Sequence, residues 1–220
     1  MNKIIHITCF FLISLSANAQ LQKDPEARKI LDKFSARSVG DYPVQIHFEY
    51  TNESLMDQEK YTETGSLILL DDKFRLKIGE ADIYCNGETI WNHLTTADEV
   101  YLSDAEDAGG DDFFISSPQE LFIFYKDNFK YQLKDEITYQ TKQLYQIYLY
   151  PDDLNGSYHT IKLLINKDDF RLYSAEALGK HGVNHTLLIT DYTKKVKTED
   201  TTFMFTPGDY PDIEVIDTRF

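Results

Sequence analysis

The sequence predicts a mainly β protein: an open antiparallel half-barrel of about eleven strands with amphipathic helices as a lid over its concave face. Turn-forming residues separate short apolar segments along most of the chain, a pattern typical of β-sandwiches and barrels. Tyr and Phe, which favour strands and fill large cores, number 15 and 14. Two amphipathic segments interrupt the strands, and the concave face of a curled sheet is the simplest place to bury their apolar sides.

The first nineteen residues are expected to be a signal peptide and not part of the fold. Lys3 supplies a positive start, residues 4–15 are mostly apolar, and Ala17-Asn18-Ala19 matches a cleavage site with small residues. Cleavage after Ala19 leaves residues 20–220, which we expect to form a single exported domain.

The composition argues against several classes of function. A net charge of −15 is unfavourable for binding nucleic acid, and equally for electrostatic docking to anionic lipid headgroups. No nucleophile elbow, metalloprotease helix or phosphate-binding loop is present, so we expect no enzyme activity, no cofactor and no metal site. Cys85 is the one cysteine outside the signal peptide, which excludes an internal disulfide.

A helix is predicted from Asp24 to about residue 38. Asp24-Pro25-Glu26 combines an N-cap, a first-turn proline and a favourable negative charge. One apolar stripe follows, formed by Ala27, Ile30, Leu31 and Phe34. Residues 44–50 then alternate between apolar and polar side chains, which indicates a half-buried strand.

Short strands are predicted over residues 59–70, 73–79, 81–86, 88–94 and 98–103. Asp71-Asp72, Gly79-Glu80 and Asn86-Gly87 form the turns between them, because these residue types tolerate the positive φ of tight hairpins. The acidic run at 104–112 is interpreted as a solvated loop rather than a calcium site.

The second half repeats this pattern after a second helix. The helix is predicted over 117–125, where Pro118 follows two serines and the apolar residues Leu121, Phe122 and Phe124 come next. Five strands are expected after it, near 129–134, 142–150, 157–166, 170–179 and 184–193. Turn residues such as Asn155-Gly156 separate them.

The order of these motifs resembles the periplasmic lipoprotein carriers of the LolA family. The resemblance is carried by a strand opening in Gly65-x-Leu67, by Phe74, and by the hairpin Asn86-Gly87-x-x-Ile90-Trp91. A Phe203-x-Phe205-x-Pro207 ending completes it. The family's fold is the half-barrel, and the resemblance implies an acyl-chain cavity, a periplasmic location, an inner-membrane release complex and an outer-membrane acceptor.

Apolar side chains are the candidates for the lipid-binding cavity, although each of them also fits an ordinary core. The predicted cavity residues are Phe48, Leu69, Phe74, Leu76, Tyr84 and Trp91, and the predicted lid residues are Ile30, Leu31, Phe34, Leu121, Phe122 and Phe124. A dry cavity of this kind holds acyl chains at about 0.8 kcal/mol per buried CH₂, without any charged contact.

One segment departs from the family pattern. In the family a basic residue followed by Pro precedes the Phe of the third strand and helps to hold the lid. Here the segment reads Leu70-Asp71-Asp72-Lys73-Phe74, with no Arg and no Pro. The chain therefore resembles a divergent member that lacks the lid-holding arginine, and a looser lid is expected because carboxylates do not donate hydrogen bonds.

The function predicted on these grounds is a monomeric periplasmic carrier that shuttles acyl chains of lipoproteins, or another lipid, from the inner to the outer membrane. Two alternatives remain open. One is a lipid- or lipoprotein-sensing domain in envelope stress signalling, and the other is a secreted module that binds a glycan or peptide through its tyrosines.

Overall fold

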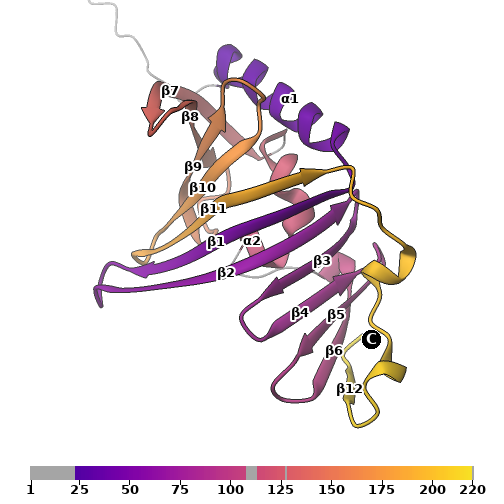
Figure 1. Ribbon diagram of the computed structural model, residues 1–220. Helices are drawn as coiled ribbons and strands as arrows, with labels where there is room; N and C mark the ends of the chain where they lie inside the picture. The colour runs from indigo at the N-terminus through magenta and orange to yellow at the C-terminus, as the bar shows by residue number, and fades with distance from the viewer. Residues whose placement is uncertain (1–22, 108–112, 127, 220) are drawn as a thin grey trace, which may run out of the picture.

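A computed structural model describes residues 23–107, 113–126 and 128–219, and these form a curled, open sheet of twelve strands (Figure 1). The strand order is β12-β6-β5-β4-β3-β2-β1-β11-β10-β9-β8-β7. Every pair is antiparallel except the edge pair of β12 with β6. The predicted fold class, a mainly β open sheet with a helix packed against it, is confirmed. Within the described residues, no helix has the length and apolar character needed to cross a membrane.

The strands of the first half are β1 (Val44–Ser54), β2 (Glu59–Leu70), β3 (Lys73–Ile78), β4 (Ala81–Cys85), β5 (Thr89–Leu94) and β6 (Glu99–Asp104). Those of the second half are β7 (Phe129–Tyr139), β8 (Lys142–Pro151), β9 (Tyr158–Asn166), β10 (Leu172–Gly179), β11 (Val183–Lys194) and β12 (Glu214–Asp217). The described helices are α1 (Pro25–Gly40) and α2 (Phe113–Ser116), with short 3-10 turns between elements.

Helix α1 begins where its capping residues predict. The Asp24 carboxylate accepts hydrogen bonds from the N–H groups of Glu26 (2.8 Å) and Leu133 (3.0 Å). The first of these bonds caps the helix, and the second ties its start to the edge strand β7. The N–H of Asp24 also donates to the carbonyl of Tyr131 on β7. The apolar stripe of α1 is buried in the main core, as its spacing predicts.

The chain crosses the sheet twice, once on each face. The first meander runs outward from β1 to β6, but β7 lies at the opposite edge, so the connection from β6 to β7 has to pass over one face. The second meander returns from β7 to β11, which pairs with β1. The tail after Lys194 then crosses the other face and ends as β12 beside β6 (Figure 1).

The second predicted helix, over 117–125, is not continuous. The structure has α2 and then two 3-10 turns, Pro118–Phe122 and Phe124–Lys126. Pro118 explains why α2 does not continue into the first turn, because the residue before a proline is disfavoured in the helical region, and Ser117 has φ −139° and ψ 61°. The two turns themselves are separated at Ile123, which has φ −129° and ψ −17°. The connection is therefore a chain of short turns that follows the curved sheet.

Gly65 marks a close approach between neighbouring strands. It lies opposite Phe48 in the β1–β2 pair, and the Phe48 ring covers it. A Cβ at Gly65 would lie 2.4 Å from Cζ of Phe48 and 2.7 Å from the carbonyl oxygen of Lys77. Since real Cβ atoms do not come so close, glycine is required here for the aromatic ring to lie flat against the sheet.

Candidate functional site

One face of the sheet, here called the inner face, is apolar and lies against α1 and the connection from β6 to β7. Alternate residues of the central strands point to it, among them Ile46 and Phe48 of β1, Leu67 of β2 and Leu76 of β3. All four side chains are buried. The period of two along each strand places them together.

The connection from β6 to β7, described over residues 113–126 and here called the crossover segment, packs its own apolar side chains onto the inner face. A cavity remains between the two, lined by Ile46, Phe48, Leu67, Leu76, Phe114, Pro118, Leu121, Leu187 and Ile189. Its volume for the centre of a water molecule is about 10 Å³, roughly enough for one water. At this place the crossover side chains fill most of the space over the inner face.

Ring packing and hydrogen bonds join the crossover segment to α1. The rings of Phe34 and Phe122 meet edge to face, with centroids 5.6 Å apart. Nearer the surface, the hydroxyl of Tyr125 donates to Asp32 at 3.0 Å, and Arg28 binds the same carboxylate. Burial and the Asp32 hydrogen bond raise the pKa of Tyr125 to about 12, so the phenol stays protonated and keeps donating. The sequence led us to expect a looser lid, because the family arginine is missing. In the structure these contacts attach the crossover segment to α1.

Most of the predicted lid residues lie between α1, the crossover segment and the sheet. The buried ones are Ile30, Leu31, Phe34, Leu121 and Phe122. Phe124 belongs to the last 3-10 turn, and its side chain lies outside the described part of the structure. The helix and the crossover segment thus share one core with the inner face.

The six predicted cavity residues do not share one face. Phe48 and Leu76 line the small cavity, and Leu69 and Phe74 are buried on the same inner face beside it. The placement of Tyr84 and Trp91 was wrong, because both lie on the outer face. In the β3–β4 hairpin Phe74 pairs with Cys85 and Leu76 with Ile83, so the inner positions of β4 are the residues that flank Tyr84.

Several lining residues were missed by the sequence reasoning. Leu187 and Ile189 of β11 reach the inner face because β11 pairs with β1 in the middle of the sheet. Their alternation along the strand was a usable signal, but nothing local shows which strand of the second meander pairs with β1. Phe114 belongs to the crossover segment, and which face of the sheet this segment covers is set by the tertiary structure.

The outer face of β3 to β5 holds a second, smaller core under the tail. Phe205 of the tail packs against Tyr84 and His93, and Tyr210 stacks on Phe205. Beneath them Asp82 accepts hydrogen bonds from Arg75 (2.8 and 3.0 Å) and from the Tyr84 hydroxyl (3.0 Å). The hairpin that ends in Ile90-Trp91, from which a cavity was predicted, therefore forms part of the surface on which the tail packs.

The titration of Asp82 predicts a loss of stability in acid. Burial by itself would raise its pKa, but the hydrogen bonds from Arg75 and Tyr84 and the Arg75 and Lys77 charges outweigh burial and hold the pKa below the usual 3.8. A lowered folded-state pKa stabilises the fold above the unfolded-state pKa, and this contribution is lost as the pH falls through the folded value.

We therefore expect the free energy of unfolding to decrease once the pH drops under about 4. The fluorescence of Trp91 should report the unfolding transition. Asp82→Asn should be less stable at neutral pH and should lose less on acidification. Denaturant titrations at several pH values measure both effects. Parallel pH profiles for the two proteins would contradict the assignment.

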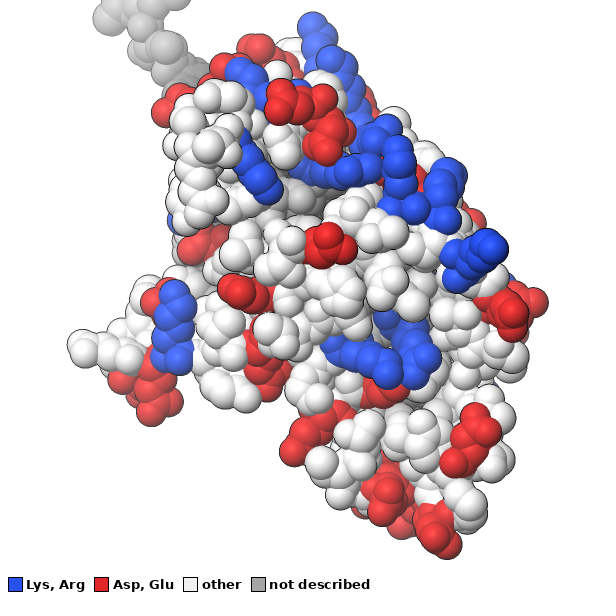
Figure 2. Space-filling model, in the orientation of Figure 1, with Lys and Arg blue, Asp and Glu red and all other residues white. Residues whose placement is uncertain are grey.

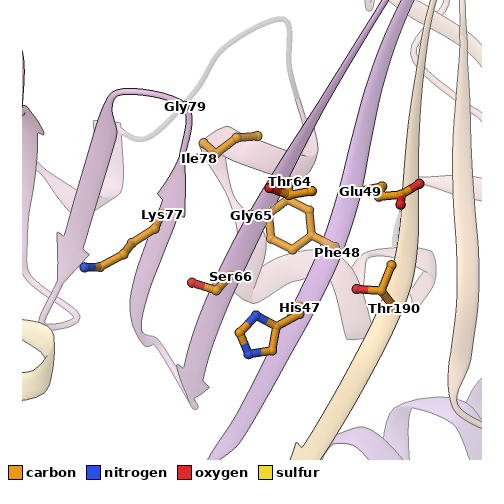
Figure 3. A pocket seen from close by; sticks show the side chains of 10 residues that line it. All are labelled: His47, Phe48, Glu49, Thr64, Gly65, Ser66, Lys77, Ile78, Gly79 and Thr190. Atoms are coloured by element: carbon orange, nitrogen blue, oxygen red, sulfur yellow. The ribbon is translucent and has the colours of Figure 1, made fainter.

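A second, more polar pocket opens on the outer face. It has a volume of about 530 Å³ and runs over Gly65 between β1, β2, β3 and β11 (Figure 3). Glu49 and Lys77 supply charges of opposite sign at its rim, His47 supplies an imidazole, and Thr64, Ser66 and Thr190 supply hydroxyls. It is broad and open, and its charges converge on no single point (Figure 3).

Metal binding and nucleophilic chemistry would fall to the cysteine, histidine and acidic side chains of the described residues. Among them, no group of three or more His, Cys, Asp or Glu side chains is arranged to hold a metal ion. Burial raises the pKa of the Cys85 thiol, which favours the protonated, unreactive form. His185, one of two closely spaced histidines, bonds through Nδ1 to the hydroxyl of Tyr50.

Solved structures share this fold at low sequence identity. An uncharacterized conserved protein from Thermus thermophilus superposes with a TM-score of 0.55 at 14% identity, over 87% of this chain and 99% of the other. LprF from Mycobacterium bovis gives 0.50 at 10% identity, over 81% and 98%. A LolA superfamily protein from Nitrosomonas europaea gives 0.44 at 14% identity, over 81% and 97%.

With the Thermus thermophilus protein and LprF this likeness is one of fold, at low sequence identity. No protein-family model matches the chain. No curated protein matches it by sequence.

Proposed function

We propose that the protein is a carrier that binds acyl chains of lipoproteins, or of another lipid, on its inner face. The observation that carries this proposal is the continuous apolar surface from β1, β2, β3 and β11, covered by a segment that crosses it instead of completing the sheet. We further propose that the chain is exported and acts in the cell envelope, shuttling its cargo between membranes.

Binding would require the crossover segment to move. Phe114, Pro118 and Leu121 now occupy the space over Phe48 and Leu76, and the free volume is that of about one water. An acyl chain that replaces them restores the burial they lose, at about 0.8 kcal/mol per CH₂. Exchange of one apolar surface for another keeps the net affinity moderate, which suits a carrier that must release its cargo.

The crossover segment is suited to such a movement. It consists of α2 and two 3-10 turns, so few backbone hydrogen bonds hold it together. Its attachment rests on apolar contacts with the inner face and on the Phe34–Phe122 and Asp32–Tyr125 contacts with α1. The strands beneath it are paired on both sides and provide the fixed part of the site.

Uptake of a fluorescent acyl-chain probe from neutral vesicles tests this proposal. Leu121→Ala removes a side chain that is 2% exposed and holds the segment down, whereas Ile123→Ala removes one that is 41% exposed on the same segment. Truncation of a buried leucine costs about 2–5 kcal/mol. Part of this lost free energy destabilises the attached crossover segment relative to a state in which it has moved away from the inner face. We therefore expect Leu121→Ala to take up the probe at least about tenfold faster.

The Ile123→Ala variant should match the wild type in this assay. Native mass spectrometry of the wild type after exposure to phospholipid should show bound lipid. A wild type that takes up no probe and retains no lipid would refute the carrier function. Equal uptake rates for the wild type, Leu121→Ala and Ile123→Ala would mean that the probe does not bind under the crossover segment.

A further inference from the structure

The positive charges of this acidic protein are unevenly placed. Lys29, Lys33 and Arg37 recur every four residues on α1, so they form one line along its exposed side. The line continues into Lys194, Lys195 and Lys197, at the end of β11 and the start of the tail. Figure 2 shows the resulting row of basic side chains, here called the basic stripe.

Backbone contacts join the two halves of the stripe. Lys194 pairs with Val44 in the β1–β11 ladder, and the N–H of Lys195 donates to the carbonyl of Asp41 at 3.1 Å, directly after α1. The Lys195 ammonium also donates to the carbonyl of Tyr42 at 2.9 Å. The six cations thus belong to one fixed surface of the fold and are not scattered over separate loops.

These charges are largely uncompensated. No ion pair joins any of the five stripe lysines to an acidic side chain within the described residues. Arg37 pairs with Asp41, a buried carboxylate that Arg171 also binds. Asp32, on a neighbouring side of α1, accepts hydrogen bonds from Arg28 and Tyr125. A chain with 37 acidic and 22 basic residues therefore presents a locally positive surface.

We propose that the basic stripe docks the protein onto an anionic lipid bilayer. Five of its six cations are lysines, which are depleted at protein–protein interfaces, whereas clusters of lysine or arginine bind anionic membranes. The stripe is a line on a convex helix, where a flat array of headgroup phosphates is the complementary surface. Its local charge reverses the expectation, drawn from the net charge, that the protein avoids anionic headgroups.

Docking through the stripe would also bring the candidate site close to the membrane. Helix α1 holds the crossover segment through Phe122 and Tyr125, so a bilayer bound along α1 lies beside the segment that must move. The inference rests on the proposed function only for this consequence. Membrane binding itself is measured without any acyl-chain uptake.

Flotation of the mature protein with vesicles tests the stripe. Vesicles of phosphatidylcholine with one-third phosphatidylglycerol are compared with pure phosphatidylcholine at low and high salt. We expect binding to the anionic vesicles alone and its loss at high salt, because exposed charges are screened. The triple variant Lys29→Glu, Lys33→Glu, Lys197→Glu should bind at least about tenfold more weakly.

Two control variants test whether binding depends on the stripe itself, rather than on net charge or on exposed apolar side chains. Lys60→Glu, Lys130→Glu, Lys134→Glu changes the net charge equally at exposed lysines outside the stripe and should bind as the wild type does. Met56→Ser with Leu154→Ser removes two side chains, each 81% exposed, on other turns, and should also bind normally. Loss of binding in either control would overturn the proposal.

A wild type that does not bind anionic vesicles would also overturn it and would point to an acidic protein as the partner of the stripe. The stripe variant should still take up the acyl probe from neutral vesicles at the wild-type rate. Failure of docking and failure of the carrier function are therefore distinguishable, since the first is read from anionic vesicles and the second from neutral ones.

Discussion

Replacing Phe34 with alanine is expected to lower the free energy of unfolding by about 3–5 kcal/mol. Phe34 is the last residue of the apolar stripe of α1, is fully buried, and its ring meets Phe122 edge to face. Its loss removes contacts with the sheet side of the core and with the crossover segment together. The surrounding elements come from both halves of the chain, so little collapse into the cavity is expected.

Urea titration of residues 20–220 measures this effect. Val39→Ala is a suitable control, because Val39 is on the same helix but 45% exposed, and its truncation should cost about 0.5 kcal/mol or less. A small loss for Phe34→Ala, close to that of Val39→Ala, would mean that α1 contributes little to the core and rests loosely on it.

Removing the carboxylate of Asp41 is expected to cost about 3 kcal/mol. Asp41 follows the last residue of α1, is 3% exposed, and binds Arg171 at 2.9 and 3.1 Å and Arg37 at 3.2 Å. Asp41→Ala removes the carboxylate that lies between the two guanidinium groups, and leaves Arg171 with its longer ion pair to Asp169 at 3.4 Å. The same carboxylate thus joins α1 to the segment that leads into β10.

Asp200→Ala provides the comparison. It breaks an ion pair with Lys73 at 3.3 Å, but the Asp200 side chain is 89% exposed, so the free energy of unfolding should change by less than about 1 kcal/mol. Denaturant midpoints for the two variants test the difference. If Asp41→Ala and Asp200→Ala prove equally mild, the Arg37–Asp41–Arg171 cluster is solvated in solution and does not hold α1.

Local patterns predicted most of the elements. The cap at Asp24, the stripe ending in Phe34 and the alternation from Val44 to Tyr50 each depend on neighbours within about one helical turn or a few strand residues. Such signals survive without any tertiary information. The second helix was predicted wrongly: Pro118 starts a 3-10 turn instead of an α-helix, and the backbone leaves the helical region at Ile123.

The candidate site was predicted only in part, and the reason lies in strand parity. Phe48 and Leu76 lie on the inner face, whereas Tyr84 and Trp91 belong to the outer one. Every one of these residues is large and apolar, so composition does not distinguish the faces. A hairpin turn decides which residues pair, and a shift by one position moves an entire strand to the other face.

By itself, the sequence determined the class of fold, the start and apolar side of α1, and the run of short strands, because these follow from short-range periodicity and capping. Only the tertiary structure decided which strands meet in the middle of the sheet, which face the crossover segment covers, and where the positive charges gather. These depend on contacts between residues far apart in the chain, such as Lys194 with Val44 and Phe34 with Phe122. No local pattern encodes them, since the pairing of β11 with β1 and the edge position of β7 are settled by the burial of the whole inner face.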